Sequence, residues 1–85
     1  MSSDLKRRVG ERLRNRRSRI GSTIRALADA SGVSARYITS AEHGQANLSL
    51  GKLERLCVAL DIPMAWLVSD GKRGEIDALL ADRTD

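Results

Sequence analysis

The stretch LADASGVSARYI, residues 27–38, sets a glycine and a serine between two short apolar patterns. Leu27 precedes Gly32 by little more than one helical turn, and glycine can take the positive φ that ends a helix. Ser34 can accept hydrogen bonds from the backbone N–H groups that open the next helix. The stretch therefore predicts two short helices joined by a tight turn, the second running from Ser34 to about His43.

Apolar residues elsewhere recur at spacings of three and four, and no stretch alternates as a half-buried strand does. Thr23, Ser34 and Ser49 are expected to cap the second, third and fourth of five helices, and Pro63 to open the fifth. The fold class is therefore all-α and compact. The expected buried positions are Leu5, Val9, Leu13 and Ile20 before a turn at Gly21, Leu27 and Ala28, Ile38 and Ala41, and then Leu50, Leu53, Leu56, Cys57 and Leu60.

The length of 85 residues suits one small domain. We expect that domain over residues 1–69, followed by a polar tail with a short helix over residues 70–85. Hydrophobic residues make up 41% of the chain, and no apolar run approaches the roughly 20 residues of a membrane span. The N-terminus lacks the apolar stretch of a signal peptide, and Cys57 is the single cysteine. These features predict a cytoplasmic protein without membrane association.

Positive charge is concentrated at the start of the chain. Residues 1–25 carry nine basic side chains against two acidic ones, whereas the remaining sixty residues carry six basic and nine acidic ones. A segregated positive surface attracts polyanions, and nucleic acid is the commonest of these. The alternative is that the basic residues only keep a first helix solvated.

The third predicted helix has two distinct faces at 100° per residue. Ile38 and Ala41 point to one side, which fits a core, and Tyr37 and Glu42 lie at its edges. The opposite side is small and polar, so it can lie close to a duplex, and an arginine there can donate two hydrogen bonds to guanine. The predicted base contacts are Ala35, Arg36, Thr39 and Ser40.

Two quoted stretches carry a family resemblance. LADASGVSARYI meets the core, small-residue and turn-glycine demands of a helix-turn-helix, and EHGQANLSLGKLERLCVALDIP follows it over residues 42–63. Together they resemble the phage-repressor and Cro-type helix-turn-helix family, often called the XRE family, over about residues 9–68. The segment is also similar to regulators of anaerobic benzoate degradation and to restriction-modification controller proteins. The resemblance implies a lambda-repressor-like domain that binds double-stranded DNA.

The resemblance also implies residue roles. Arg17 stands where the family often has an arginine that pairs with the glutamate corresponding to Glu42. Ile24 stands where a glutamine normally meets the DNA backbone, and Arg16 and Ser22 stand where leucines are usual, so Ile20 is expected to take over part of that core. The predicted phosphate contacts are Arg14, Thr23, Ser34, Tyr37, His43, Asn47 and Lys52.

The sequence thus predicts a DNA-binding transcriptional regulator with the third helix in the major groove. A homodimer is expected through the final helix, where Trp66 is either a core residue or a dimer contact. The alternative function is an antitoxin or another protein-interaction module with the same fold. His43 and Cys57 have no partners at catalytic or metal-ligand spacing, so we expect no enzyme, metal site or cofactor, and no small-molecule pocket is apparent.

Overall fold

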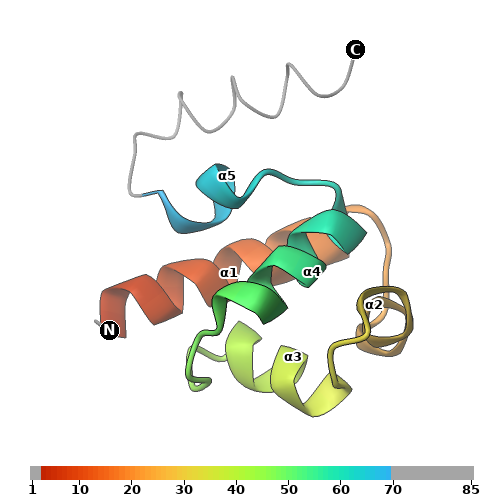
Figure 1. Cartoon of the computed structure of the whole chain (residues 1–85), viewed down its shortest axis with the longest axis horizontal. Helices are drawn as coiled ribbons and strands as arrows, with labels where there is room; N and C mark the ends of the chain where they lie inside the picture. The colour runs from red at the N-terminus through yellow and green to blue at the C-terminus, as the bar shows by residue number, and fades with distance from the viewer. Residues whose placement is uncertain (1–2, 70–85) are drawn as a thin grey trace.

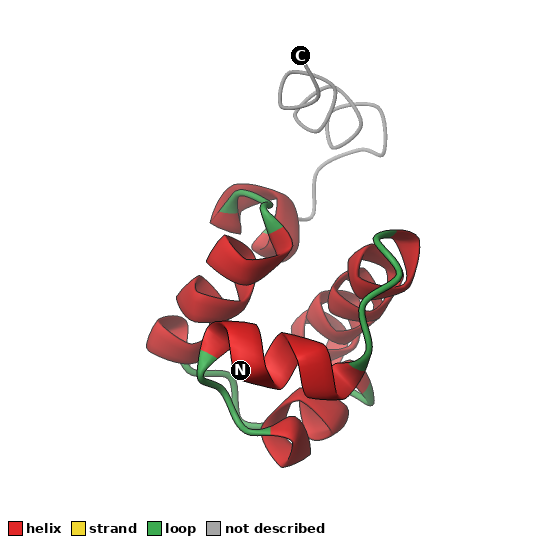
Figure 2. Cartoon of the chain, turned by 90° about the vertical axis from the view of Figure 1, so that its right-hand side faces the viewer, coloured by secondary structure: helices red, strands yellow, loops and turns green. Residues whose placement is uncertain are grey.

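The computed structural model describes residues 3–69, which contain five helices joined by short loops (Figure 1). Helices and loops are the only structure in this range (Figure 2), so the all-α, five-helix prediction is confirmed. The prediction for residues 70–85 lies outside the described residues. The helices are α1 (Ser3–Arg19), α2 (Ile24–Ser31), α3 (Ala35–Glu42), α4 (Leu50–Leu60) and α5 (Met64–Val68).

The long helix α1 runs through the middle of the domain, with α3 on one side of it and α5 on the other (Figure 1). Helix α2 packs against both α3 and α4, and α4 also packs against α5. The two short helices α2 and α3 therefore sit at one side of a frame made by α1, α4 and α5. This arrangement leaves the outer side of α3 uncovered.

The turn between α2 and α3 forms as the sequence predicts. Gly32 ends α2 with a φ of +75°, and its N–H donates to the carbonyl of Ala28 at 2.9 Å. Ser34 then caps α3, its hydroxyl accepting from the N–H of Tyr37 at 3.1 Å. A side chain at position 32 would be strained by the left-handed backbone, which explains the glycine there.

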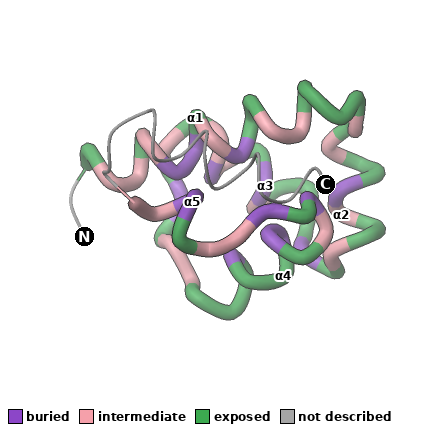
Figure 3. Tube along the Cα trace, turned by 90° about the horizontal axis from the view of Figure 1, so that it is seen from above, coloured by how far each residue is buried: buried purple, intermediate pink, exposed green. Residues whose placement is uncertain are grey.

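Most of the predicted core is buried (Figure 3), but two predicted core residues are not. Ile20 is 46% exposed, because α1 ends at Arg19 and Ile20 already lies in the turn. Arg16 fastens this end of α1 instead, since its Nε donates to the carbonyl of Leu60 at 2.9 Å. The buried apolar residues are Val9, Leu13, Leu27, Val33, Ile38, Ala41, Ala46, Leu53, Leu56, Cys57, Leu60, Ile62, Trp66 and Leu67.

Leu50 is the second core prediction that is wrong, with 77% of its surface exposed. It opens α4 and lies about 70° around the helix from the centre of the buried stripe of Leu53, Leu56, Cys57 and Leu60. Val58 on the same helix is also 77% exposed. Leu5 and Ala28 are half-buried and pack against the core. Ile24 packs there as well, at the position where the family resemblance implies a glutamine that meets the DNA backbone.

Gly10 allows α1 and α3 to approach each other closely. A Cβ atom at this position would lie 2.3 Å from the carbonyl oxygen of Ala41 and 3.0 Å from that of Glu42. Both are backbone atoms, so they cannot move aside as a flexible side chain could. The small residue on α1 thus fixes how deeply the C-terminal end of α3 sits in the domain.

Candidate nucleic-acid interface

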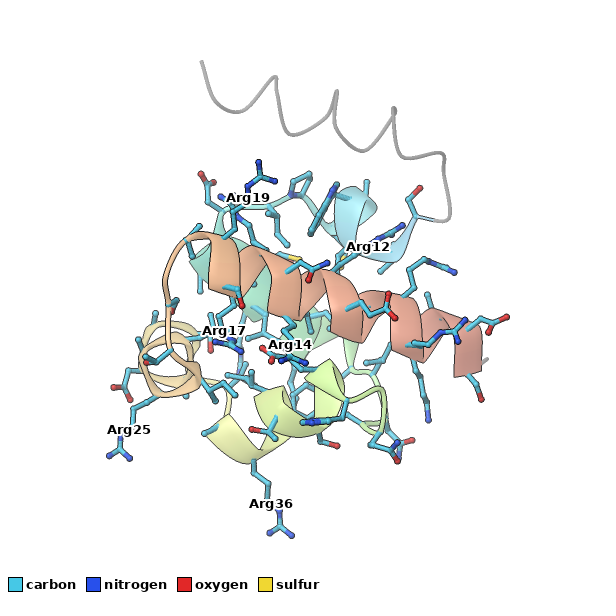
Figure 4. The ribbon with its side chains drawn as sticks, turned by 180° about the vertical axis from the view of Figure 1, so that it is seen from behind. Arg12, Arg14, Arg17, Arg19, Arg25 and Arg36 are labelled. Atoms are coloured by element: carbon cyan, nitrogen blue, oxygen red, sulfur yellow. The ribbon has the colours of Figure 1, made fainter. Side chains whose placement is uncertain are left out.

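The outer face of α3 carries the side chains predicted to contact bases. Ala35, Arg36 and Thr39 are exposed and Ser40 is half-buried, whereas Ile38 and Ala41 on the opposite side are completely buried. Arg36 extends away from the body of the protein in Figure 4. The face therefore presents one long cation among small side chains, with nothing from the described chain covering it.

Helix α3 is fastened to α1 by an ion pair. Arg17 Nε donates to Glu42 Oε2 at 2.6 Å and its Nη2 donates to Oε1 at 3.0 Å. The side chains are only 15% and 4% exposed, so the pair is largely shielded from water. The hydrogen bond to Glu42, together with its charge, raises the pKa of Arg17 although burial opposes the shift. Arg17 also donates to the carbonyl of Ser22 at 2.9 Å, which ties the α1–α2 turn to the same pair.

Two predicted phosphate contacts are helix caps. The hydroxyl of Thr23 accepts from the N–H of Ala26 at 3.0 Å, and the hydroxyl of Ser34 accepts from Tyr37. A hydroxyl that accepts a backbone hydrogen bond keeps its own hydrogen for donation. Both caps can therefore still donate to a phosphate oxygen at the start of α2 or α3.

Tyr37, Asn47 and Lys52 come together beside α3. The Tyr37 hydroxyl lies 3.2 Å from the carbonyl of Asn47 and 3.1 Å from the backbone nitrogen of Ser49, and the Lys52 ammonium lies 4.5 Å from the centre of its ring. The single hydroxyl hydrogen is directed to a carbonyl inside the protein. The predicted phosphate contact of Tyr37 would require that bond to open, whereas Asn47 and Lys52 are exposed and available.

His43 ends α3, and its ring is already engaged. Its Nδ1 lies 2.7 Å from the carbonyl of Thr39. Because a carbonyl only accepts, Nδ1 carries a hydrogen, and Nε2 is an acceptor as long as the ring is neutral. The predicted phosphate contact therefore requires the protonated ring.

Much of the positive charge of α1 is used inside the domain. Arg12 Nη1 donates to the carbonyls of Trp66 at 3.0 Å and Leu67 at 3.3 Å, and also to that of Ser69. Arg8 donates to the carbonyl of Val68 at 3.3 Å. With Arg16 and Arg17, these side chains satisfy helix ends and a buried carboxylate, so the basic segment is not one free positive surface as its composition suggests.

The arginines of the domain face different directions. Arg25 on α2 and Arg36 on α3 extend outward on the same side in Figure 4, whereas Arg12 points toward α5. Arg14, a predicted phosphate contact, is exposed on α1. Arg25 was not among the DNA contacts predicted from the sequence. Its position in the first turn of a predicted helix, just after the predicted turn at Gly21, could have indicated that it extends outward.

No helix among residues 3–69 is long and apolar enough to cross a membrane. No group of three or more histidine, cysteine, aspartate or glutamate side chains within that range could hold a metal ion.

The comparisons with known proteins agree with this geometry. A sequence model of the helix-turn-helix domain family matches residues 8–65. The chain belongs to this family. The crystal structure of the restriction-modification controller protein C.AhdI from Aeromonas hydrophila is 39% identical in sequence and superposes with a TM-score of 0.67, covering 73% of this chain and 92% of that one. The predicted likeness to XRE-type domains and to restriction-modification controllers is thus confirmed.

Curated relatives of this helix-turn-helix domain are named as transcriptional regulators. The regulator ClgR of Mycobacterium tuberculosis is 34% identical over 62 residues, which are 73% of this chain and 55% of ClgR. The regulator SinR of Bacillus licheniformis is 30% identical over 73 residues, which are 85% of this chain and 66% of SinR. The chain thus matches little more than half of ClgR. The likeness to benzoate regulators stays a prediction.

Proposed function

We propose that this helix-turn-helix domain binds specific DNA sequences to regulate transcription, with α3 in the major groove. The observation that carries the proposal is the exposed face of α3, on which Arg36 stands in the first turn among Ala35, Thr39 and Ser40. Small neighbours permit close approach to base edges, and the arginine guanidinium matches the two acceptors of guanine.

Groups suited to phosphate surround that face. Thr23 and Ser34 stand at the starts of α2 and α3, where unpaired N–H groups and the helix dipole favour anions. Asn47 and Lys52 are exposed beside α3, in the loop to α4 and in the first turn of α4. Contacts of this kind fix the register of a protein on the duplex, and base contacts then specify the sequence. The proposal assigns these two tasks to different residues.

Selection of bound sites from random duplex DNA tests the proposal, followed by titration of the selected site at several salt concentrations. We expect one recurrent sequence and a log–log salt slope of magnitude about 4 or more per dimer, because each half-site neutralises a few phosphates. Failure to enrich any duplex, together with a slope near zero, would contradict the proposal and favour a protein-interaction module.

We further propose that the domain acts as a homodimer through the outer face of α4. Trp66 is only 7% exposed, so it is a core residue and contributes little surface to a partner. Leu50 and Val58 are instead exposed, and an open groove of about 680 Å³ beside them is also lined by Met64. Glu54 and Arg55 lie on the same exposed side of α4, which lets a second copy pair opposite charges across a two-fold axis.

Sedimentation of Val58→Asp tests this surface. The substitution places a charge at the centre of the proposed contact, and we expect the dimer dissociation constant to rise by at least about tenfold. Ile20→Asp is the matched control, because Ile20 is an exposed apolar residue outside this face. Equal dissociation constants for the two variants would place the dimer contact elsewhere.

A further inference from the structure

Tyr37 joins three parts of the proposed interface through one side chain. Its hydroxyl donates to the carbonyl of Asn47 and accepts from the N–H of Ser49. Its ring lies beneath the ammonium of Lys52, and its own N–H donates to the cap hydroxyl of Ser34. The α3–α4 loop and the start of α4 are therefore both held by a residue of α3.

The bond to Ser49 has a consequence for all of α4. Ser49 is the N-cap of that helix, and its hydroxyl accepts from the N–H of Lys52 at 3.4 Å. The Tyr37 hydroxyl thus fixes the residue from which α4 begins. Arg36 directly precedes Tyr37 in the chain. The Tyr37 side chain therefore also positions the start of α4 relative to the face of α3 that carries Arg36.

An open polar hollow of about 500 Å³ lies between these elements. Arg36 and Lys52 border it as the two cations, and Ser40 and Asn47 also line it. Two positive side chains together with a hydroxyl and an amide suit a phosphodiester of the DNA backbone. Its walls come from α3, the loop and α4, so its shape depends on the bonds that Tyr37 makes.

We propose that Tyr37 is a positioning residue, which holds the α3–α4 loop and Lys52 so that a DNA phosphate enters this hollow while Arg36 meets a base. The inference rests on the proposed function. Because the hydroxyl hydrogen is used within the protein, Tyr37 acts through the loop and does not itself touch DNA. Specific binding requires one register, whereas non-specific binding tolerates many, so loosening the loop weakens specific binding more.

Tyr37→Phe tests the inference on the duplex selected by the wild-type protein and on a scrambled duplex. The variant loses both hydroxyl bonds and keeps the ring under Lys52. We expect the affinity ratio between the two duplexes to fall by about fivefold to tenfold, which corresponds to the net contribution of one or two hydrogen bonds. The salt slope should stay unchanged, because no cation is lost.

Lys52→Gln is the matched control for the charge. It should lower the magnitude of the salt slope by about 1 per half-site and weaken binding to both duplexes alike. If Tyr37→Phe also weakens both duplexes equally and preserves their ratio, Tyr37 contacts phosphate directly and the positioning role is wrong. Wild-type affinities for both duplexes would equally overturn it.

Amide hydrogen exchange of the free protein tests the anchoring of the loop independently of DNA binding. The Ser49 amide should exchange faster in Tyr37→Phe, whereas amides in the middle of α1 should keep their wild-type rates. An unchanged Ser49 rate would overturn the anchoring itself. If the wild-type protein selects no duplex, the proposed function and the DNA part of this inference both fail, and the exchange rates still decide whether Tyr37 holds the loop.

Discussion

Removing the Glu42 carboxylate should destabilise the domain substantially. In Glu42→Ala the guanidinium of Arg17 keeps its bond to the Ser22 carbonyl but loses two bonds of 2.6 and 3.0 Å in a site where its side chain is only 15% exposed. Breaking a buried pair in this way costs about 3–5 kcal/mol, and the remaining bond and partial exposure favour the lower end.

The expected loss of about 3 kcal/mol is a large share of the 5–15 kcal/mol that small domains typically have. At about 4–8 °C for each kcal/mol in a domain of this size, the melting temperature should fall by at least about 12 °C. Thermal unfolding followed by circular dichroism measures the change. Glu11→Ala is the control, because Glu11 is an exposed carboxylate on α1, and its effect should stay within about 0.5 kcal/mol.

Replacing both residues of the ion pair distinguishes the stability that the pair contributes from the cost of burying one unpaired charge. In Arg17→Met combined with Glu42→Leu no charge is left in the site, and such replacements are often neutral. The double variant should therefore recover at least half of the stability lost in Glu42→Ala. If Glu42→Ala and Glu11→Ala melt at the same temperature, the pair does not stabilise the contact between α1 and α3.

Three further predictions concern the frame around α3. Gly10→Ala should destabilise the domain by about 1–3 kcal/mol in urea unfolding, because its Cβ would lie 2.3 Å from the Ala41 carbonyl oxygen. Arg12→Met should destabilise the domain by about 1–3 kcal/mol, because the carbonyls at the end of α5 lose their hydrogen-bond donor. Arg14→Met at an exposed position should change stability little, and equal losses in the two variants would contradict the capping role of Arg12. Burial raises the pKa of Cys57 from 9.0 to about 11, so the native protein should react slowly with a thiol reagent at pH 8. The neutral thiol contributes its full stability below pH 9, and this contribution should be lost as the pH rises through 11.

Local signals in the sequence were sufficient for the helix boundaries around the turn. Thr23, Ser34 and Gly32 each act within four residues of their own position, so their chemistry predicts where α2 and α3 begin and end. The end of α4 had no such signal, because Asp61 takes a φ of +55° at a position where glycine is usual. Periodicity likewise placed Val9, Leu13 and the α4 stripe in the core, since these positions recur on one face of each helix and lie within its helical residues.

Contacts between distant elements could not be predicted in the same way. The carbonyls that accept from Arg12 lie more than fifty residues away along the chain. The sequence therefore contains no sign that this arginine is engaged within the domain. The Tyr37 hydroxyl bonds to backbone atoms of a loop whose path no pattern specifies. Ile20 fell on the correct stripe but beyond the last helical residue, where the stripe no longer faces the core.

The most direct test of base reading by α3 is the affinity ratio between the selected and scrambled duplexes for Arg36→Ala. Loss of a bidentate contact should lower the free-energy preference for the selected duplex by about 1–3 kcal/mol per half-site, and the affinity ratio falls accordingly. The fold and non-specific binding should persist. Arg14→Ala, which removes a predicted phosphate contact, should weaken both duplexes alike and preserve the ratio. A wild-type ratio in Arg36→Ala would contradict the claim that this face of α3 reads DNA sequence.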